Sequence, residues 1–243
     1  MLKRYPSLTE QVKIHLKQRI INAEFEGRMP SETDLAHELH VSRNTVRDAL
    51  SRLEMEGVIF RKQGAGTFVN ETTLLVKTRL EEILPYETLI QEHGYTPSIH
   101  LVSVDDPITD ANIAADLLLK PNEPLLMIQK LFFADKQPVI LNTTYIPIIL
   151  IQQPYIAADL QAPIYEFLPR FCQQMLAYYL SDIVPLVATP SLTARLNLPD
   201  KKMALLSLEE IGHNQDKMPI IKAKSYFRDD LLRLRLIRRQ SIN

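Results

Sequence analysis

Arg43, Asn44 and Arg47 follow one another closely in the stretch VSRNTVRDALSRLEMEGVIFRKQGAGTFV, residues 41–69. A guanidinium can donate two hydrogen bonds to O6 and N7 of guanine, and an asparagine amide can pair with N6 and N7 of adenine. In the N-terminal half of a helix, such side chains can reach base edges in the major groove of DNA. The alternative is that they form an ordinary solvated helix face.

The helix that would position these three side chains can be read from its apolar residues. Val46, Leu50 and Leu53 have the spacing of a buried helical stripe, and the three polar side chains project away from it. Ser42 is placed to cap the N-terminus, and Gly57 stands just past the end, where a left-handed residue is usual. The sequence therefore predicts one helix with a packing face and a base-reading face.

Two further helices are predicted before it. The first begins at Ser7, with Glu10 completing a capping box, and the second begins after Pro30 with Ser31 as its N-cap. Helix N-termini bind phosphate through their free N–H groups. We therefore expect Ser31 and Thr45 to contact the DNA backbone.

A short ribbon follows the third helix. VIFRK and TFV have the composition of two strands joined at QGAG, and Gly64 and Gly66 permit a tight tip that approaches the sugar-phosphate chain closely. Arg61 and Lys62 supply charge beside the tip, and Thr67 supplies a hydroxyl group. Three helices and a ribbon predict an all-α winged helix-turn-helix domain over residues 1–70, and the agreement of all these features favours DNA binding over a solvated face.

Composition limits the classes that remain. The chain has 243 residues, 46% of them hydrophobic, and a formal net charge of −1, with 11 basic and 9 acidic side chains in residues 1–70. The single cysteine, Cys172, excludes an intrachain disulfide and a thiolate zinc cluster, and we expect it to be buried. Without a signal-peptide pattern or an apolar run long enough to cross a bilayer, we expect a cytoplasmic protein with no membrane partner.

Residues 71–79 have the composition of a linker, and residues 80–243 have the pattern of a second, α+β domain. The sequence from Ala114, AADLLLKPNEPLLMIQKLFFADKQPVI, is repeated weakly from Thr193, TARLNLPDKKMALLSLEEIGHNQDKMPII. We expect one pseudo-duplicated domain with helices on one face of a largely antiparallel sheet. Strands are predicted near 99–105, 125–134, 138–146, 177–185, 203–211 and 219–228, and helices near 80–93, 109–119, 163–172 and 190–197.

The segment MPSETDLAHELHVSRNTVRDALSRLEMEGVIFRKQGAGTFV resembles the DNA-binding domain of the GntR family of bacterial transcription regulators. The resemblance covers about residues 7–69 and rests on PSE, VSRNTVRDAL, L..EG and G.GTFV, which appear in order with the right gaps. It implies the DNA contacts expected above. Many relatives have an arginine directly after PSE that contacts DNA; here the residue is Thr33, so that contact is not carried over.

The C-terminal region resembles the UTRA domain of the HutC-type GntR subfamily over about residues 80–240. The resemblance rests on LEEILPYETLIQEHGYTPS, ADKQPVILNTTYIP, PIYEFL and SYFRDD. It implies a chorismate-lyase-like fold, homodimers and a small-molecule site between the halves of the domain. The positions it implies for effector binding are Ser98, Lys130, Phe132, Asn142, Tyr165, Ile221, Lys222 and Arg228.

Several of these positions depart from relatives that sense phosphorylated amino sugars. Lys130 and Phe132 stand where those relatives have two arginines, and Asn142 and Ile221 stand where they have glutamates. Burying the same sugar would leave its polar groups unpaired, at about 1–3 kcal/mol each. We therefore expect a different effector, less polar or carrying a single acid group near Lys130. The alternative is that Phe132 and Ile221 are core residues.

These observations predict a ligand-responsive, dimeric transcription regulator, most often a repressor in this family, that binds a palindromic operator in double-stranded DNA. Two other classes compete with it. One is an enzyme of the chorismate-lyase-like fold, but residues 80–243 show no catalytic triad, metal-ligand spacing or phosphate-binding glycine loop. The other is a winged helix used only for protein interaction, which has no need of base-reading side chains. We therefore expect neither catalysis nor a cofactor or metal.

Overall fold

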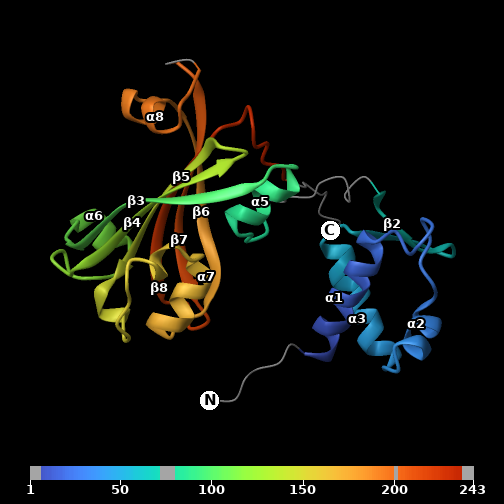
Figure 1. Cartoon of the computed structure of the whole chain (residues 1–243). Helices are drawn as coiled ribbons and strands as arrows, with labels where there is room; N and C mark the ends of the chain where they lie inside the picture. Colours follow the sequence, from blue (N-terminus) through green and yellow to red (C-terminus); the bar gives the residue numbers. More distant parts are fainter. Residues whose placement is uncertain (1–6, 72–79, 200–201, 237–243) are drawn as a thin grey trace. The chain divides into compact units, whose positions relative to one another are not determined.

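The computed structural model describes residues 7–71, 80–199 and 202–236, and these form two compact units (Figure 1). The N-terminal unit contains the described residues up to 71, and the C-terminal unit contains those from 80 to 236. Almost all of the linker predicted at 71–79 lies outside the described residues.

The N-terminal unit is the predicted winged helix-turn-helix. Ser7, Ser31 and Ser42 each accept a hydrogen bond from the backbone N–H three residues later, so the predicted N-caps are confirmed. Gly57 ends the third helix with φ +69°. The elements are α1 (Leu8–Ile21), α2 (Glu32–Glu38), α3 (Arg43–Met55), β1 (Ile59–Lys62) and β2 (Gly66–Val69).

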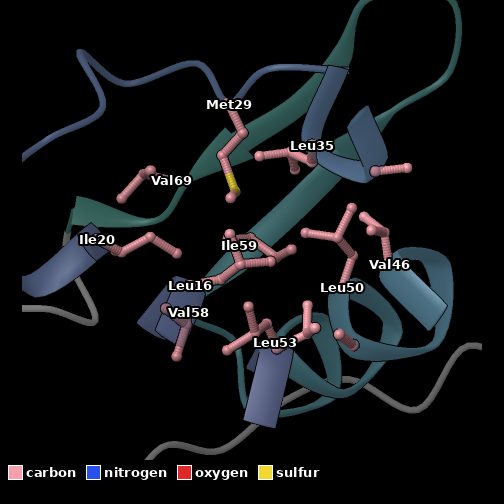
Figure 2. Packing of buried hydrophobic residues seen from close by; sticks show 13 residues of the cluster. Leu16, Ile20, Met29, Leu35, Val46, Leu50, Leu53, Val58, Ile59 and Val69 are labelled. Carbon is pink, nitrogen blue, oxygen red and sulfur yellow. The ribbon is translucent and has the colours of Figure 1, made fainter. Parts of the chain in front are cut away.

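Figure 2 shows the core of this unit, where side chains from all three helices and the ribbon point toward one another. Val46, Leu50 and Leu53 of α3 are fully buried, as their spacing predicted, and Leu16 of α1 packs with them. This packing fixes which side of α3 faces inward. The opposite side therefore remains accessible to solvent.

The ribbon is extended by the segment before α2. β1 and β2 pair antiparallel from Ile59↔Val69 to Lys62↔Gly66. The N–H of Met29 donates to the carbonyl of Thr67 (2.9 Å), and the N–H of Val69 donates to the carbonyl of Gly27 (2.7 Å). The start of α2 is thereby tied to the wing.

The C-terminal unit is built on one six-stranded antiparallel sheet with the order β3-β4-β5-β8-β7-β6. Figure 1 shows the strands of this sheet in green to red, with the short helices around them. The strands are β3 (Pro97–Ile108), β4 (Leu125–Ala134), β5 (Gln137–Pro147), β6 (Leu176–Val187), β7 (Ala204–Asn214) and β8 (Pro219–Phe227). The helices are α5 (Tyr86–Glu92), α6 (Ala111–Asp116), α7 (Ile164–Phe167) and α8 (Pro190–Arg195).

The internal repeat is present in the topology. Each half runs strand, short helix, strand, turn, strand: β3-α6-β4-β5 in the first half and β6-α8-β7-β8 in the second. The two halves meet where β5 pairs with β8. The predicted DK turns recur as well, because Asp135, Lys136 and Lys217 all have positive φ. A mostly antiparallel α+β domain with a pseudo-repeat is therefore confirmed.

Three details of the prediction differ from the structure. The helix expected at 80–93 begins only at Tyr86, because Pro85 disfavours helical geometry in the residue before it. The helix expected at 163–172 is one α-helical turn followed by a π-helical turn, Leu168–Cys172. The expectation of helices on one face is wrong: Leu192 and Leu196 of α8 pack with Leu141 on the face of the sheet opposite to that of Asn142.

Cys172 is buried and free, as expected. Within the described residues, no helix is long and apolar enough to cross a membrane.

Candidate DNA-binding surface and ligand cavity

The outward face of α3 carries the predicted base-reading residues. The side chains of Arg43 and Arg47 are 58% and 50% exposed, and Asn44 is also exposed. They lie on the side of α3 opposite its buried residues Val46, Leu50 and Leu53. The structure thus exposes all three side chains to solvent on one face of α3.

A glutamate that sequence analysis did not single out gathers the arginines of this face. Oε2 of Glu32, the first residue of α2, lies 3.3 Å from Nε of Arg47 and 3.9 Å from Nη2 of Arg43. Its Oε1 lies 3.9 Å from Nη2 of Arg61. One carboxylate therefore holds three guanidinium groups from α3 and β1 together.

Arg61 faces the recognition helix and not the wing tip. Its guanidinium lies 3.5 Å from the carboxylate of Glu54 and donates a hydrogen bond to the carbonyl of Arg47 (3.3 Å). Arg61 therefore links the wing to α3, a role that its position next to Lys62 did not reveal.

The two predicted phosphate contacts lie at helix starts, where their hydroxyl groups already have partners. Ser31 Oγ accepts from the N–H of Asp34 and donates to its carboxylate (2.6 Å). Thr45 Oγ1 lies 2.8 Å from Oγ of Ser42. The two hydroxyl groups thus form hydrogen bonds within the helix N-caps. The groups that suit a phosphate at these positions are the backbone N–H groups of the helix N-termini.

At the wing, Gly64 and Gly66 have φ +74° and +109°, so both need glycine. Nζ of Lys62 lies over the rings of Phe60 and Phe68, which stack on one another. Thr67 is partly buried and pairs with Arg61 across the ribbon.

Arg28 is a wing residue that sequence analysis missed. A Cβ at Gly66 would lie 3.3 Å from Nη2 of Arg28, so the guanidinium rests against the glycine backbone. The only sequence signal was a basic residue between Gly27 and the PSE motif.

The C-terminal unit contains a cavity of about 390 Å³ on one face of its sheet. Alternating side chains of β4, β5, β8, β7 and β6 form the floor, and residues 80–89 and 163–165 cover it. This volume falls within the range of small-molecule sites.

Four of the eight residues predicted to bind an effector line this cavity: Lys130, Phe132, Asn142 and Tyr165. Lys130 is only 7% exposed, and burial lowers its pKa to about 8. Burial also raises the pKa of Tyr165. Asn142 is buried and donates a hydrogen bond to Oγ of Ser225 (2.9 Å).

The other four lie away from the cavity. Ser98 pairs with Phe133 and Lys222 pairs with Tyr145, positions that alternate with the floor residues, so both side chains face the opposite side of the sheet. There Nζ of Lys222 forms an ion pair with Asp116 of α6 (2.7 Å).

Ile221 and Arg228 have structural surroundings. Ile221 is fully buried in an apolar cluster with Phe167 and Phe171, which agrees with the alternative that it is a core residue. Arg228 is buried, and its guanidinium donates to Asp230 and to the carbonyls of Pro138 and Leu196. The structure thus places neither side chain in the cavity.

Glu210 and Tyr86 are among the lining residues that sequence analysis missed. Glu210 of β7 is partly buried; burial raises its pKa, and Ser181 Oγ donates to its Oε1 (2.7 Å). Tyr86 begins α5, and its hydroxyl lies 2.6 Å from Oγ of Ser225. The pairing of β7 with β8 and of β8 with β5 brings Glu210 to the cavity, and the packing of α5 on the sheet brings Tyr86 there, so local sequence carried no signal for either residue.

A winged helix with exposed arginines, together with a sheet domain enclosing a ligand-sized cavity, defines a DNA-binding transcription regulator with a ligand-binding domain. Among the residues that the structure describes, no group of three or more His, Cys, Asp or Glu side chains could hold a metal ion.

Comparison with protein families gives the same class. Residues 8–69 match the model described as bacterial regulatory proteins, gntR family, and residues 92–233 match the UTRA domain. The chain belongs to the GntR family of transcription regulators and carries a UTRA domain.

Its relatives are regulators too. The chain is 26% identical to the HTH-type transcriptional repressor NagR of Bacillus subtilis, over 90% of each chain. It is 24% identical to the HTH-type transcriptional regulator GgaR of Escherichia coli K12, over 93% of this chain and 88% of GgaR. With the regulator YurK of Bacillus subtilis it shares 32% identity over half of each chain.

Solved structures share the fold. The structure of YydK from Bacillus subtilis matches 97% of this chain and 100% of its own, with a TM-score of 0.77 and 14% sequence identity. PhnF from Mycobacterium smegmatis matches 95% of this chain and 100% of its own, with a TM-score of 0.60 and 23% identity.

Proposed function

We propose that the protein is a transcriptional repressor whose operator affinity is set by a small molecule bound in the cavity of the C-terminal unit. The observation that carries this is the face of α3, where Arg43, Asn44 and Arg47 are exposed opposite a fully buried stripe. The name of the relative NagR, a transcriptional repressor, supports repression.

In this proposal the base contacts come from Arg43, Asn44 and Arg47. Backbone contacts come from the helix starts at Ser31 and Thr45 and from the wing residues, which are Arg28, Lys62, Gly64, Gly66 and Thr67. We assign residues 1–70 to DNA binding, 71–79 to a linker and 80–243 to effector binding and dimerisation. The effector contacts are Lys130, Phe132, Asn142 and Tyr165, with Tyr86 and Glu210 added from the cavity lining.

A homodimer is part of the proposal, because β6 is an edge strand with several exposed apolar side chains. Tyr178, Leu180, Val184 and Val187 are 43%, 64%, 38% and 63% exposed. An exposed apolar edge strand is a typical contact site for another chain. Two copies related by two-fold symmetry would present two recognition helices, and such an arrangement binds a palindromic operator.

The function is tested by selecting bound sites from random double-stranded DNA and measuring affinity for the selected site by fluorescence anisotropy. We expect a palindrome, and we expect Arg43→Ala and Arg47→Ala each to cost about 1–3 kcal/mol on it. Arg52→Ala is the matched control, since Arg52 lies on the same helix but pairs with Glu10. Unchanged affinity in both test variants would contradict the assignment of α3.

We propose no catalytic activity and a cytoplasmic location, in keeping with a family of transcription regulators. The chorismate-lyase-like alternative has a direct assay. Purified protein incubated with chorismate should release no pyruvate above the rate of a buffer control.

A further inference from the structure

The polar groups in the middle of the cavity floor are already paired with one another. Thr144 Oγ1 donates to Oδ1 of Asn142 (2.9 Å), and Asn142 Nδ2 donates to Oγ of Ser225 (2.9 Å). Ser225 Oγ in turn lies 2.6 Å from the hydroxyl of Tyr86. The chain of hydrogen bonds is internal, so this part of the floor demands little polar contact from a ligand.

The surroundings of that chain are aromatic and aliphatic. The ring of Tyr86 meets those of Phe132 and Phe227 edge-on, with centroids 5.1 and 5.5 Å apart. Ile128 and Leu208 also line the cavity. The middle of the cavity therefore suits the apolar body of a ligand.

Two charged groups of opposite sign stand on either side of this middle. Lys130 belongs to β4 and Glu210 to β7, with β5 and β8 between them. Three strand spacings separate them, which is about 14 Å across the sheet. They form no ion pair with one another, and each faces the cavity.

The ammonium group of Lys130 can bind an acidic group of a ligand. Its Nζ donates one hydrogen bond, to the carbonyl of Ala162 (2.5 Å), whereas an ammonium group has three hydrogens to donate. No carboxylate among the described residues lies within ion-pair distance of it, although the charge of Glu87 acts on it from farther away. A buried charge without a partner is costly, so an anionic ligand group would be stabilised there.

The carboxylate of Glu210 can bind a hydrogen-bond donor of a ligand. Ser181 donates to one carboxylate oxygen, and no lysine, arginine or histidine of the described chain lies within ion-pair distance. Burial disfavours the ionised form of Glu210 and raises its pKa. A hydrogen-bond donor of a ligand, such as an ammonium group, would stabilise the buried carboxylate.

The overall charge of the lining argues against a phosphorylated ligand. Among the residues that the structure describes, four glutamates and one lysine border the cavity, and no arginine does. A phosphate group carries close to two negative charges at neutral pH and binds best to several cations. Lys222 faces the opposite side of the sheet, where it pairs with Asp116, and the guanidinium of Arg228 is bound to Asp230 outside the cavity, so neither adds a cation to the lining.

The geometry points to a zwitterionic effector, with a carboxylate at Lys130, an ammonium group at Glu210 and an aromatic or aliphatic body between them. This inference rests on the proposed function of the cavity as the effector site. It adds the chemical class of the ligand and assigns Glu210, which no motif suggested, as the residue that selects the amine.

Calorimetric titration of the full chain with matched probes tests the inference. The probes are para-aminomethylbenzoate, which has both charges, para-toluate, which has only the acid, and para-methylbenzylamine, which has only the amine; glucosamine-6-phosphate represents phosphosugars. We expect the zwitterion to bind at least about tenfold more tightly than either half, because each half lacks one charged hydrogen bond, and we expect glucosamine-6-phosphate to bind least.

Two variants test which residue binds each charged end of the ligand. Lys130→Met should remove the advantage of the zwitterion over the amine, and Glu210→Gln should remove its advantage over the acid. Lys222→Met and Glu209→Gln are matched controls, because both residues lie on the opposite face of the sheet in ion pairs with Asp116 and Lys224. The controls should leave all affinities unchanged.

Three results would overturn the inference. One is that glucosamine-6-phosphate binds more tightly than the zwitterion, and another is that none of the charged benzene probes binds. The third is that Lys130→Met and Glu210→Gln rank the probes as the unmodified chain does. Operator affinity measured by anisotropy without ligand keeps the two proposals apart. If operator binding holds while the ranking fails, only the ligand class is wrong. If the chain binds no operator, the proposed function itself is wrong.

Discussion

Oε2 of Glu32 lies 3.3 Å from Nε of Arg47, so the first residue of α2 holds a side chain of the recognition helix. The same carboxylate lies near Arg43 and Arg61. A negative charge within a DNA-binding face weakens the general attraction to phosphate. Its benefit is orientation, because it limits the directions in which three flexible guanidinium groups can point.

We expect Glu32→Gln to bind non-specific DNA more tightly and to discriminate less well between the operator and random sequence. Without the carboxylate, the arginines can contact any phosphate. Exposed ion pairs of this kind contribute about 1 kcal/mol, so we expect the ratio of operator affinity to random-DNA affinity to fall roughly fivefold. Anisotropy titrations with both DNAs at fixed salt measure this ratio. Glu38→Gln, the same change in the same helix, is the control because Glu38 pairs with Arg19 instead; an equal effect in both would show that net charge alone is responsible.

Gly66→Ala should destabilise the N-terminal unit more than Gly64→Ala does. Gly66 has φ +109°, and its added Cβ would lie 3.3 Å from Nη2 of Arg28, whereas Gly64 has φ +74° and no described atom within 4 Å of a Cβ. Unfavourable backbone geometry of this kind costs about 1–3 kcal/mol. Urea unfolding followed by circular dichroism compares the two, and equal stabilities would refute the predicted close approach of Arg28.

Burial of Lys130 predicts a specific pH dependence of stability. Its pKa is about 8 in the folded chain and near 10.5 when unfolded, so between these values the unfolded chain binds more protons. The free energy of unfolding of the unmodified chain, relative to Lys130→Met, should therefore rise by up to about 3 kcal/mol from pH 8 to pH 10.5. Below pH 8 the difference should stay constant. A flat difference across the whole range would mean that the ammonium group is solvated; Lys222→Met serves as the control.

Leu180→Glu should convert the proposed dimer to a monomer without unfolding it. Leu180 is 64% exposed on the edge strand β6, so the chain alone has little to lose from the change, whereas a charge in a dimer contact is strongly unfavourable. Analytical ultracentrifugation gives the mass of each species. Ile149→Glu alters a similarly exposed apolar residue on another element, 70% exposed, and should leave the mass unchanged.

The recognition helix and its exposed face could be predicted because their signals are local. The stripe of α3, the cap at Ser42 and the glycine stop at Gly57 all act within a few turns of one helix, and the wing follows directly. Glu32 and Arg28 escaped prediction because their importance comes from contacts with α3 and the wing, and such contacts have no periodicity to read.

The cavity could be predicted only in part, since motif positions do not state which face of a strand a residue occupies. Ser98 and Lys222 match the expected pattern of residues yet face the opposite side of the sheet, because side chains alternate along a strand. Lys130, Phe132 and Asn142 lie on the cavity face. Glu210 stands three strands from Lys130 in the sheet, and no spacing in the sequence relates the two residues.

The cover of the cavity has a mechanical consequence for signalling. Nine of its lining residues belong to the segment from Leu80 to Leu89, which is the first described part of the chain after the linker, and Leu234 and Leu236 line it from the other end of the unit. The N–H of Leu80 donates to the carbonyl of Arg235 (2.8 Å), so the two segments are joined. A ligand that moves this cover would therefore move Leu80 and Arg235 together, so the point at which the C-terminal unit receives the chain from the DNA-binding unit is itself part of the ligand site.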